Sequence, residues 1–186
     1  CDWGYSSPAC VLWFAIDFDD NLYVYRELYT KKVVADQFAY KVLDLEQGEY
    51  IRYGVLDAST WAKRGDVGPS IAETMINSGC RWRPSDRSGK SRVNGKLEIH
   101  RRLSADAETG KPSLFIFNNC LNIIRTLPLL PCDKTNPEDV DTHAEDHAYD
   151  ALRYGCMSRP INPHGNGFSS FSQNQGYKPS DTMFGY

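Results

Sequence analysis

The stretch "PACVLWFAIDFDDNLYVYRELYT", residues 8–30, contains two β-rich runs separated by an acidic turn. The first run covers residues 8–17 and the second covers 22–30, and both are dense in the aromatic and β-branched residues that favour strands. The intervening "DFDDN" supplies the Asp and Asn side chains that are typical of turns. The stretch therefore predicts a β-hairpin near the start of the chain.

Helical and strand-like patterns alternate after this hairpin. Strands are expected at 50–57 and 113–117, and helices at 33–48, 68–79, 118–130 and 142–154. Ser70, with Glu73 three residues later, predicts a capping box at the start of the second helix. This alternation predicts an α/β fold, in which helices cover the faces of a mixed β-sheet.

Composition indicates one globular domain. Of the 186 residues, 41% are apolar and 24% are charged, which is enough for an ordinary hydrophobic core. From Arg159 onward the sequence shifts to Gly, Ser, Asn, Gln and Pro, so we expect a domain at 1–158 and a flexible low-complexity tail at 159–186. Without a signal peptide, an apolar run near 18 residues or a CxxC pair, the chain is expected to be a reduced, cytoplasmic protein without a membrane segment.

The run "THAEDHAYDALRY", residues 142–154, concentrates acids and histidines on one predicted helix. At 3.6 residues per turn, one stripe carries small or apolar residues: Ala144, Ala148, Ala151, Leu152 and Gly155. The other stripe is polar: His143, Asp146, His147, Asp150 and Tyr154. Neighbouring carboxylates repel unless something positive lies between them, and solvent, a basic surface or a metal ion could fill that role.

A basic segment lies between residues 81 and 102. Its Asn94-Gly95 pair is a hairpin signal, although the apolar spacing fits a helix equally well. We expect its cations to contact the phosphate backbone of DNA. The candidates are Arg81, Arg83, Arg87, Lys90, Arg92, Lys96, Arg101 and Arg102.

Three acids that are far apart in the sequence could form one site. Asp2 precedes the first strand, Asp57 follows a later strand, and Asp150 lies in the last helix. Carboxylate oxygens are the ligands preferred by Mg²⁺ and Mn²⁺. Two such ions, roughly 3.5–4 Å apart, can activate the attacking water and stabilise the leaving oxygen of a phosphodiester.

Two other motifs resemble functional sites without meeting their requirements. "PSDRSGKS", residues 84–91, imitates the end of a phosphate-binding loop, but Pro84 replaces the first glycine. An apolar strand before it is lacking, and Asn94-Gly95 is expected to interrupt a helix after it. His143 and His147 have the spacing of a zinc-binding helix, but Ala144 replaces the required glutamate.

Three blocks in this order carry a resemblance to a known family. They are "DWGYSSPACVLWFAIDFDDNLYVYRELY" (2–29), "LDASTW" (56–61) and "DHAYDALRYG" (146–155). Together they resemble the nuclease domain of the large terminase subunit of tailed bacteriophages, over roughly residues 2–154. The resemblance implies a ribonuclease H-like mixed sheet flanked by helices on both faces, and two catalytic Mg²⁺ or Mn²⁺ ions.

The same resemblance assigns roles to individual residues. Asp2, Asp57 and Asp150 match the catalytic metal-binding acids, with Asp146 as a further candidate ligand. His147 matches a catalytic position near the metals, and Glu27 matches an acid that supports the site or the fold. One departure is that the apolar residues expected before Asp2 are absent, so the start of its strand is left open.

The resemblance further implies cleavage of concatemeric double-stranded DNA during genome packaging in the host cytoplasm. The implied partners are double-stranded DNA, the ATPase domain of the same polypeptide, the small terminase subunit and the portal protein. ATP would belong to that ATPase domain, outside this chain. Two alternatives remain open: a ribonuclease H-like resolvase or transposase, and a non-catalytic module that binds DNA or the portal.

Overall fold

A computed structural model describes residues 1–63, 68–107 and 109–161. The predicted hairpin is present: β1 (Ala9–Ile16) pairs with β2 (Leu22–Thr30) in antiparallel register. The carboxylate of Asp17 closes its turn by accepting hydrogen bonds from the backbone and side-chain nitrogens of Asn21 and from the Tyr23 hydroxyl. Local sequence chemistry thus accounts for this hairpin.

The strands form two small sheets that the first two residues connect. β5 (Leu114–Ile116) runs parallel to β2, and β3 (Gly54–Leu56) runs parallel to β4 (Trp82–Pro84). Asp2 and Cys10 exchange backbone hydrogen bonds of 2.9 and 2.8 Å. On the other side, the Cys1 nitrogen donates to the Val55 carbonyl at 2.6 Å, and the Asp57 amide donates to the Cys1 carbonyl at 3.0 Å. Residues 1 and 2 therefore lie between β1 and β3, which places Asp2 within the sheet.

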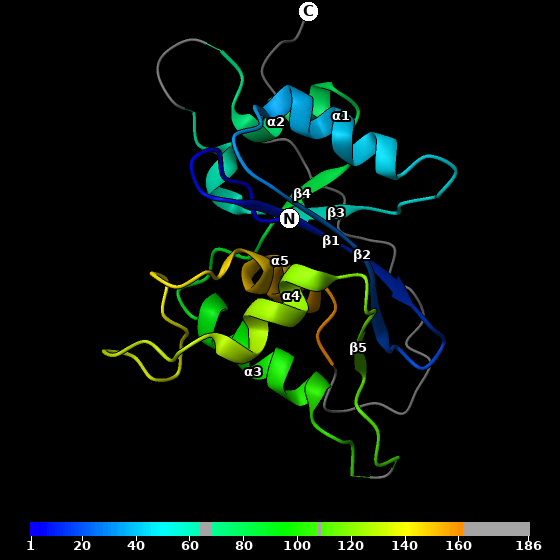
Figure 1. Cartoon of the computed structure of the whole chain (residues 1–186), viewed down its shortest axis with the longest axis vertical. Helices are drawn as coiled ribbons and strands as arrows, with labels where there is room; N and C mark the ends of the chain where they lie inside the picture. Colours follow the sequence, from blue (N-terminus) through cyan, green and yellow to red (C-terminus); the bar gives the residue numbers. More distant parts are fainter. Residues whose placement is uncertain (64–67, 108, 162–186) are drawn as a thin grey trace, which may run out of the picture.

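Five α-helices and two short 3₁₀ helices complete the described residues. Their bounds are α1 (Ala35–Leu45), η1 (Ala58–Trp61), α2 (Ile71–Asn77), α3 (Ser91–Leu103), α4 (Leu121–Thr126), η2 (Leu127–Leu129) and α5 (His147–Met157). The predicted capping box of α2 is confirmed, because Ser70 and Glu73 each accept the other's backbone amide. In Figure 1, α1 and α2 lie above the β1–β2 hairpin, and α3, α4 and α5 lie below it.

β1 contributes to two hydrophobic cores because its successive side chains point to opposite faces. Cys10 and Leu12 pack in one core with residues of α3, α4 and α5. Val11 and Trp13 pack in the other core with residues of α1 and α2. The uninterrupted apolar sequence of β1 follows from this two-sided burial. Among the described residues, none of the helices is both long and apolar enough to cross a membrane.

The last helix is shorter than predicted. α5 begins at His147, with Asp146 as its N-cap residue, so His143 and Ala144 are not helical. The carboxylate of Asp141 accepts from the His143 amide at 2.9 Å, and the Asp141 carbonyl accepts from Ala144 at 3.2 Å. Local turns of this kind compete with helix formation, which explains the later start.

The basic segment forms a strand and a helix. β4 was not predicted, and the Asn94-Gly95 pair lies inside α3, not in a hairpin. The expectation that Asn94-Gly95 interrupts a helix after residues 84–91 was therefore wrong, whereas β4 is a short, largely exposed strand and not an apolar one. The missing first glycine still distinguishes this segment from a phosphate-binding loop.

The predicted tail lies mainly outside the described residues. Its first part is held against the domain: the Arg159 guanidinium pairs with Asp20 at 2.6 Å, and the Ile161 amide donates to the Glu98 carboxylate at 2.8 Å.

Candidate active site

The structure brings Asp2, Asp57 and Asp150 together from three elements. Asp2 lies between β1 and β3, Asp57 follows β3, and Asp150 lies in the first turn of α5. Burial is the main cause that raises the pKa of Asp2, and the nearby charges of Asp150 and Asp57 raise it further. The carboxylate of Asp2 therefore lies near both Asp57 and Asp150.

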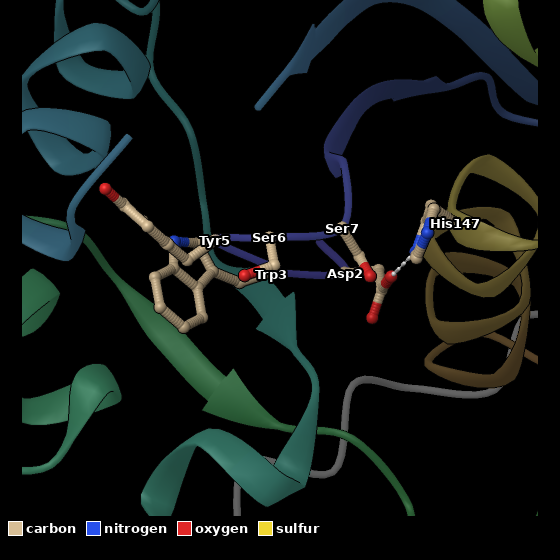
Figure 2. Close-up of a pocket in the computed structure, with 7 residues that line it drawn as sticks. Asp2, Trp3, Tyr5, Ser6, Ser7 and His147 are labelled. Carbon is tan, nitrogen blue, oxygen red and sulfur yellow. Dashed lines mark hydrogen bonds and ion pairs between the residues drawn. The ribbon is translucent and has the colours of Figure 1, made fainter. Parts of the chain in front are cut away.

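Asp2 is paired with His147. The imidazole Nδ1 of His147 lies 2.9 Å from Oδ2 of Asp2, an interaction drawn in Figure 2. This hydrogen bond is the main cause that raises the pKa of His147. Both side chains border a pocket of about 380 Å³, whose remaining wall is the loop of residues 3–7. The pair thus holds an imidazole at the edge of an open, polar recess.

Asp57 is held by the turn that follows it. Its carboxylate accepts a hydrogen bond from the Ser59 amide at 3.1 Å and another from the Ser59 hydroxyl. These contacts cap the 3₁₀ helix η1. The carboxylate is fixed by its own loop and remains partly exposed.

Two guanidinium groups hold the acids of α5. The Arg153 Nε donates to Oδ1 of Asp150 at 2.9 Å, and Arg92 Nη1 lies 3.3 Å from Oδ2 of the same residue. Arg92 also contacts Asp139 and Asp146, at 2.7 and 3.9 Å. Burial, followed by the charge of Asp150, raises the pKa of Asp146 to about 6.

The chemistry of this donor set fits hard divalent cations. Asp2, Asp57, Asp146 and Asp150 supply carboxylate oxygens, which Mg²⁺ and Mn²⁺ prefer. Within the described ranges, however, no group of three acidic, histidine or cysteine side chains is arranged to hold an ion. Both oxygens of Asp150 face guanidinium groups. The required ligands are present near one another, but their side chains do not form a coordination site in this conformation.

Glu27 supports the fold. Its two carboxylate oxygens accept the backbone amides of Asn122 and Ile123 at 2.9 and 2.8 Å. These amides belong to the first turn of α4, where backbone donors lack helical partners and a negative charge is favourable. Glu27 therefore joins β2 to α4.

The predicted DNA-contacting residues divide into two groups. Five are exposed: Arg81, Arg83, Arg87, Lys90 and Arg101. Arg81 and Arg83 stack over Tyr50 and Tyr53, with 5.6 and 4.3 Å from each guanidinium carbon to the ring centroid. This group combines accessible charge with exposed or partly exposed aromatic rings.

The remaining three cations turn inward. Arg102 is fully buried and pairs with Glu98 at 3.0 Å, so the prediction that it contacts DNA is wrong. Lys96 donates to the carbonyl oxygens of Pro137 and Asp139, and Arg92 pairs with the acids of α5. Arg92 and Lys96 are thus used within the protein.

Sequence reasoning missed two residues that border the acids, Asp139 and Arg153. The spacing of Asp150 and Arg153 permits an ion pair on one helix, so this contact had a local signal. Asp139 had none, because its partner Arg92 lies 47 residues earlier in the chain.

A scan against protein-family models finds no match, and a search of curated proteins finds none. Among solved structures, the chain is similar to the P22 large terminase nuclease domain, with a TM-score of 0.63. The match covers 85% of this chain and 78% of that chain, at 19% sequence identity.

The chain has the fold of a large terminase nuclease domain. The resemblance carried by the three sequence blocks is thereby confirmed at the level of the fold. A further structure, the large terminase nuclease from thermophilic phage G20c with bound cobalt, matches with a TM-score of 0.47 and 13% identity over 81% of each chain. In this fold, α5 and the segment beside β1 present Asp150 and Asp2, and Arg92 at the start of α3 contacts Asp146 and Asp150.

Proposed function

We propose that this chain is a ribonuclease H-like endodeoxyribonuclease domain of a viral large terminase. It would cut concatemeric double-stranded DNA during genome packaging, by metal-dependent hydrolysis of a phosphodiester. What supports the proposal is the terminase nuclease fold, together with the Asp2–His147 pair, whose carboxylate is affected by the charges of Asp57 and Asp150.

Asp2, Asp57 and Asp150 would hold two Mg²⁺ or Mn²⁺ ions, with Asp146 as a further ligand. Bound there, the ions would supply an acidified water and a positive charge for the leaving oxygen. The carboxylates have different surroundings. The carboxylate of Asp57 is held by its own loop, whereas that of Asp150 is shared with two arginines.

His147 would orient the attacking water or a phosphate oxygen. Its Nδ1 is engaged by Asp2, which fixes the ring and directs Nε2 away from that carboxylate. Binding would depend on the exposed cations, including Arg81, Arg83 and Lys90, through contacts with phosphates. Such contacts are independent of DNA sequence, so the place of cutting would be set by partners: the ATPase domain, the small subunit and the portal, in the host cytoplasm.

The test is nicking of a supercoiled plasmid with Mg²⁺ or Mn²⁺ and with EDTA, using Asp57→Asn as the diagnostic variant. Asparagine caps a helix as well as aspartate does, so the fold should survive. The parent should nick with either metal and not with EDTA, and Asp57→Asn should reduce the rate by about 10²-fold or more. Circular dichroism should show an unchanged fold.

Four results would change the conclusion. Cleavage that persists in EDTA, or an undiminished rate in Asp57→Asn, contradicts the two-metal proposal. A strong preference for branched over linear DNA would indicate a resolvase instead. DNA binding without nicking in any metal would indicate a non-catalytic module.

A further inference from the structure

The guanidinium of Arg92 lies among three carboxylates that come from two other parts of the chain. Its Nε is 2.7 Å from Oδ2 of Asp139, and its Nη1 is 3.3 Å from Oδ2 of Asp150. Its Nη2 is 3.9 Å from Oδ2 of Asp146. Arg92 itself belongs to the first turn of α3, so three segments meet at this side chain.

This cluster is largely shielded from water. The side chain of Arg92 is 30% exposed, and those of Asp139, Asp146 and Asp150 are 15%, 11% and 12% exposed. The Nη2 atom is buried, and it has no hydrogen-bond partner among the described residues. Burying a charged donor in this way is costly unless neighbouring opposite charges compensate. Its surroundings favour an internal role over a phosphate contact.

The segment around Asp139 holds the guanidinium of Arg92 in place. Lys96, one helical turn after Arg92, donates to the backbone oxygens of Pro137 and Asp139 at 2.9 and 3.1 Å. Lys96 therefore holds the backbone of Asp139 against α3, and this contact does not involve the Asp139 carboxylate. The short bond from Asp139 then anchors Arg92, which faces Asp146 and Asp150.

We infer that Arg92 is a positioning residue of the candidate active site, which holds Asp146 and Asp150 together when no metal ion lies among them. These acids are one turn apart at the start of α5 and repel each other. The guanidinium offsets that repulsion and ties both acids to the segment around Asp139. The inference rests on the proposed function only in treating these acids as catalytic.

A measurable consequence is that a divalent cation should partly replace the positive charge of Arg92. Without Arg92 the metal-free protein loses the attraction that offsets its clustered acids. A divalent cation bound by the acids would restore part of that attraction. Metal should therefore stabilise a protein lacking Arg92 more than it stabilises the parent.

The experiment is thermal melting in EDTA and then in increasing Mn²⁺, without DNA. Arg92→Met should melt roughly 5–10 °C below the parent in EDTA, and Arg92→Lys should fall between them because it keeps the charge but loses the planar fork. Mn²⁺ should raise the melting temperature of Arg92→Met by more than that of the parent. Arg101→Met, which removes an exposed charge from the same helix, is the control and should melt like the parent in EDTA.

Equal melting temperatures and equal Mn²⁺ shifts for Arg92→Met and Arg101→Met would overturn the inference. If Arg92→Met does not fold, a double-mutant cycle of Arg92→Lys and Asp139→Asn replaces it. Coupled effects on melting support the role, and additive effects overturn it. A parent that fails to nick DNA but shows the predicted melting pattern would refute the nuclease proposal and leave the role of Arg92 intact.

Discussion

At the scale of single residues, the carboxyl group of Asp146 combines burial with an unfavourable charge. The side chain is 11% exposed, and its carboxyl group has a pKa of about 6, because burial and the charge of Asp150 disfavour the ionised form. An aspartate in the unfolded chain titrates near 3.9. The folded state therefore binds the proton of the Asp146 carboxyl group more tightly than the unfolded chain does. The stability that this protonation confers is lost as the pH rises from about 4 through 6.

Asp146→Asn should remove this pH-dependent loss. We compare the free energy of unfolding of the variant with that of the parent in metal-free buffer. This difference should be about 2–3 kcal/mol more favourable to the variant at pH 7.5 than at pH 4. Urea unfolding at both pH values measures it. Asp133→Asn is a control of opposite sign, because hydrogen bonds from Thr135 and Asn136 hold the pKa of Asp133 low. A difference between Asp146→Asn and the parent that does not vary with pH would contradict this account.

The Asp2–His147 pair adds to the same trend. Since the pKa of His147 is raised, the stability from its protonated form is present below about pH 6.5 and is lost as the pH rises through its folded value. The metal-free protein should consequently become less stable between pH 5 and pH 8.

At the scale of elements, the packing of α3 on α5 depends on the lack of a side chain at Gly95. A Cβ atom there would overlap Cγ and Cδ of Arg153, with 2.7 Å to Cδ. Arg153 is buried and holds Asp150, so it has little room to move. In an isolated helix, alanine would be favoured over glycine by about 1 kcal/mol. At Gly95 the cost of the overlap with Arg153 should be larger than this gain.

Gly95→Ala should therefore destabilise the protein by about 1–3 kcal/mol, although the substitution favours the helix itself. It should also lower the nicking rate, because Arg153 would shift and carry Asp150 with it. Urea unfolding and the plasmid assay measure the two effects. Gly89→Ala is the matched control, since a Cβ there meets no atom within 4 Å. An increase in stability for Gly95→Ala would show that α3 and α5 separate easily.

Asp150 illustrates a similar coupling between elements. Its loss would leave the buried guanidinium of Arg153 without this carboxylate and remove one of the two contacts that Arg92 makes with the acids at the start of α5. Asp150→Asn would thus change packing as well as chemistry. Asp57, capped by its own loop, separates the two effects more cleanly.

At the scale of the whole molecule, a net charge of −3 conceals an uneven distribution. Arg81 precedes β4, Arg83 lies on β4 and Lys90 precedes α3, so three exposed cations follow one another along neighbouring elements. Each phosphate that a protein neutralises contributes about 0.9 to the slope of log K against log salt concentration. The folded surface therefore makes a quantitative prediction about DNA affinity.

Replacing Arg81, Arg83 and Lys90 with Gln should reduce the magnitude of that slope by about 0.9 for each phosphate that the protein no longer neutralises. The reduction in affinity should be similar for DNA fragments of unrelated sequence, because phosphates carry no sequence information. Fluorescence anisotropy at several salt concentrations measures both quantities. Lys41→Gln, an exposed change on α1, is the control. An unchanged slope in the triple variant would assign these cations to solvent or to a protein partner.

The sequence by itself determined the features that depend on near neighbours. The hairpin, α1, the capping box of α2 and the strand β5 follow from periodicity and from side chains that bond within a few residues of themselves. The three motif blocks likewise identified the fold. Where local chemistry competed with periodicity, as in the turns around Asp141, the helix boundary was predicted too early.

Only the tertiary structure decided how the charged residues are used. In sequence, Arg92, Lys96 and Arg102 are indistinguishable from the exposed cations around them. Arg102 pairs with Glu98 on its own helix, but the other acceptors lie on other elements, at Asp139, Asp150 and Asp20, and folding brings these within hydrogen-bonding distance. The position of Asp2 between β1 and β3 also depends on partners distant in the chain. A charge that folding buries must find a partner in the protein, whereas an exposed charge remains available to DNA, and this difference is set by long-range packing.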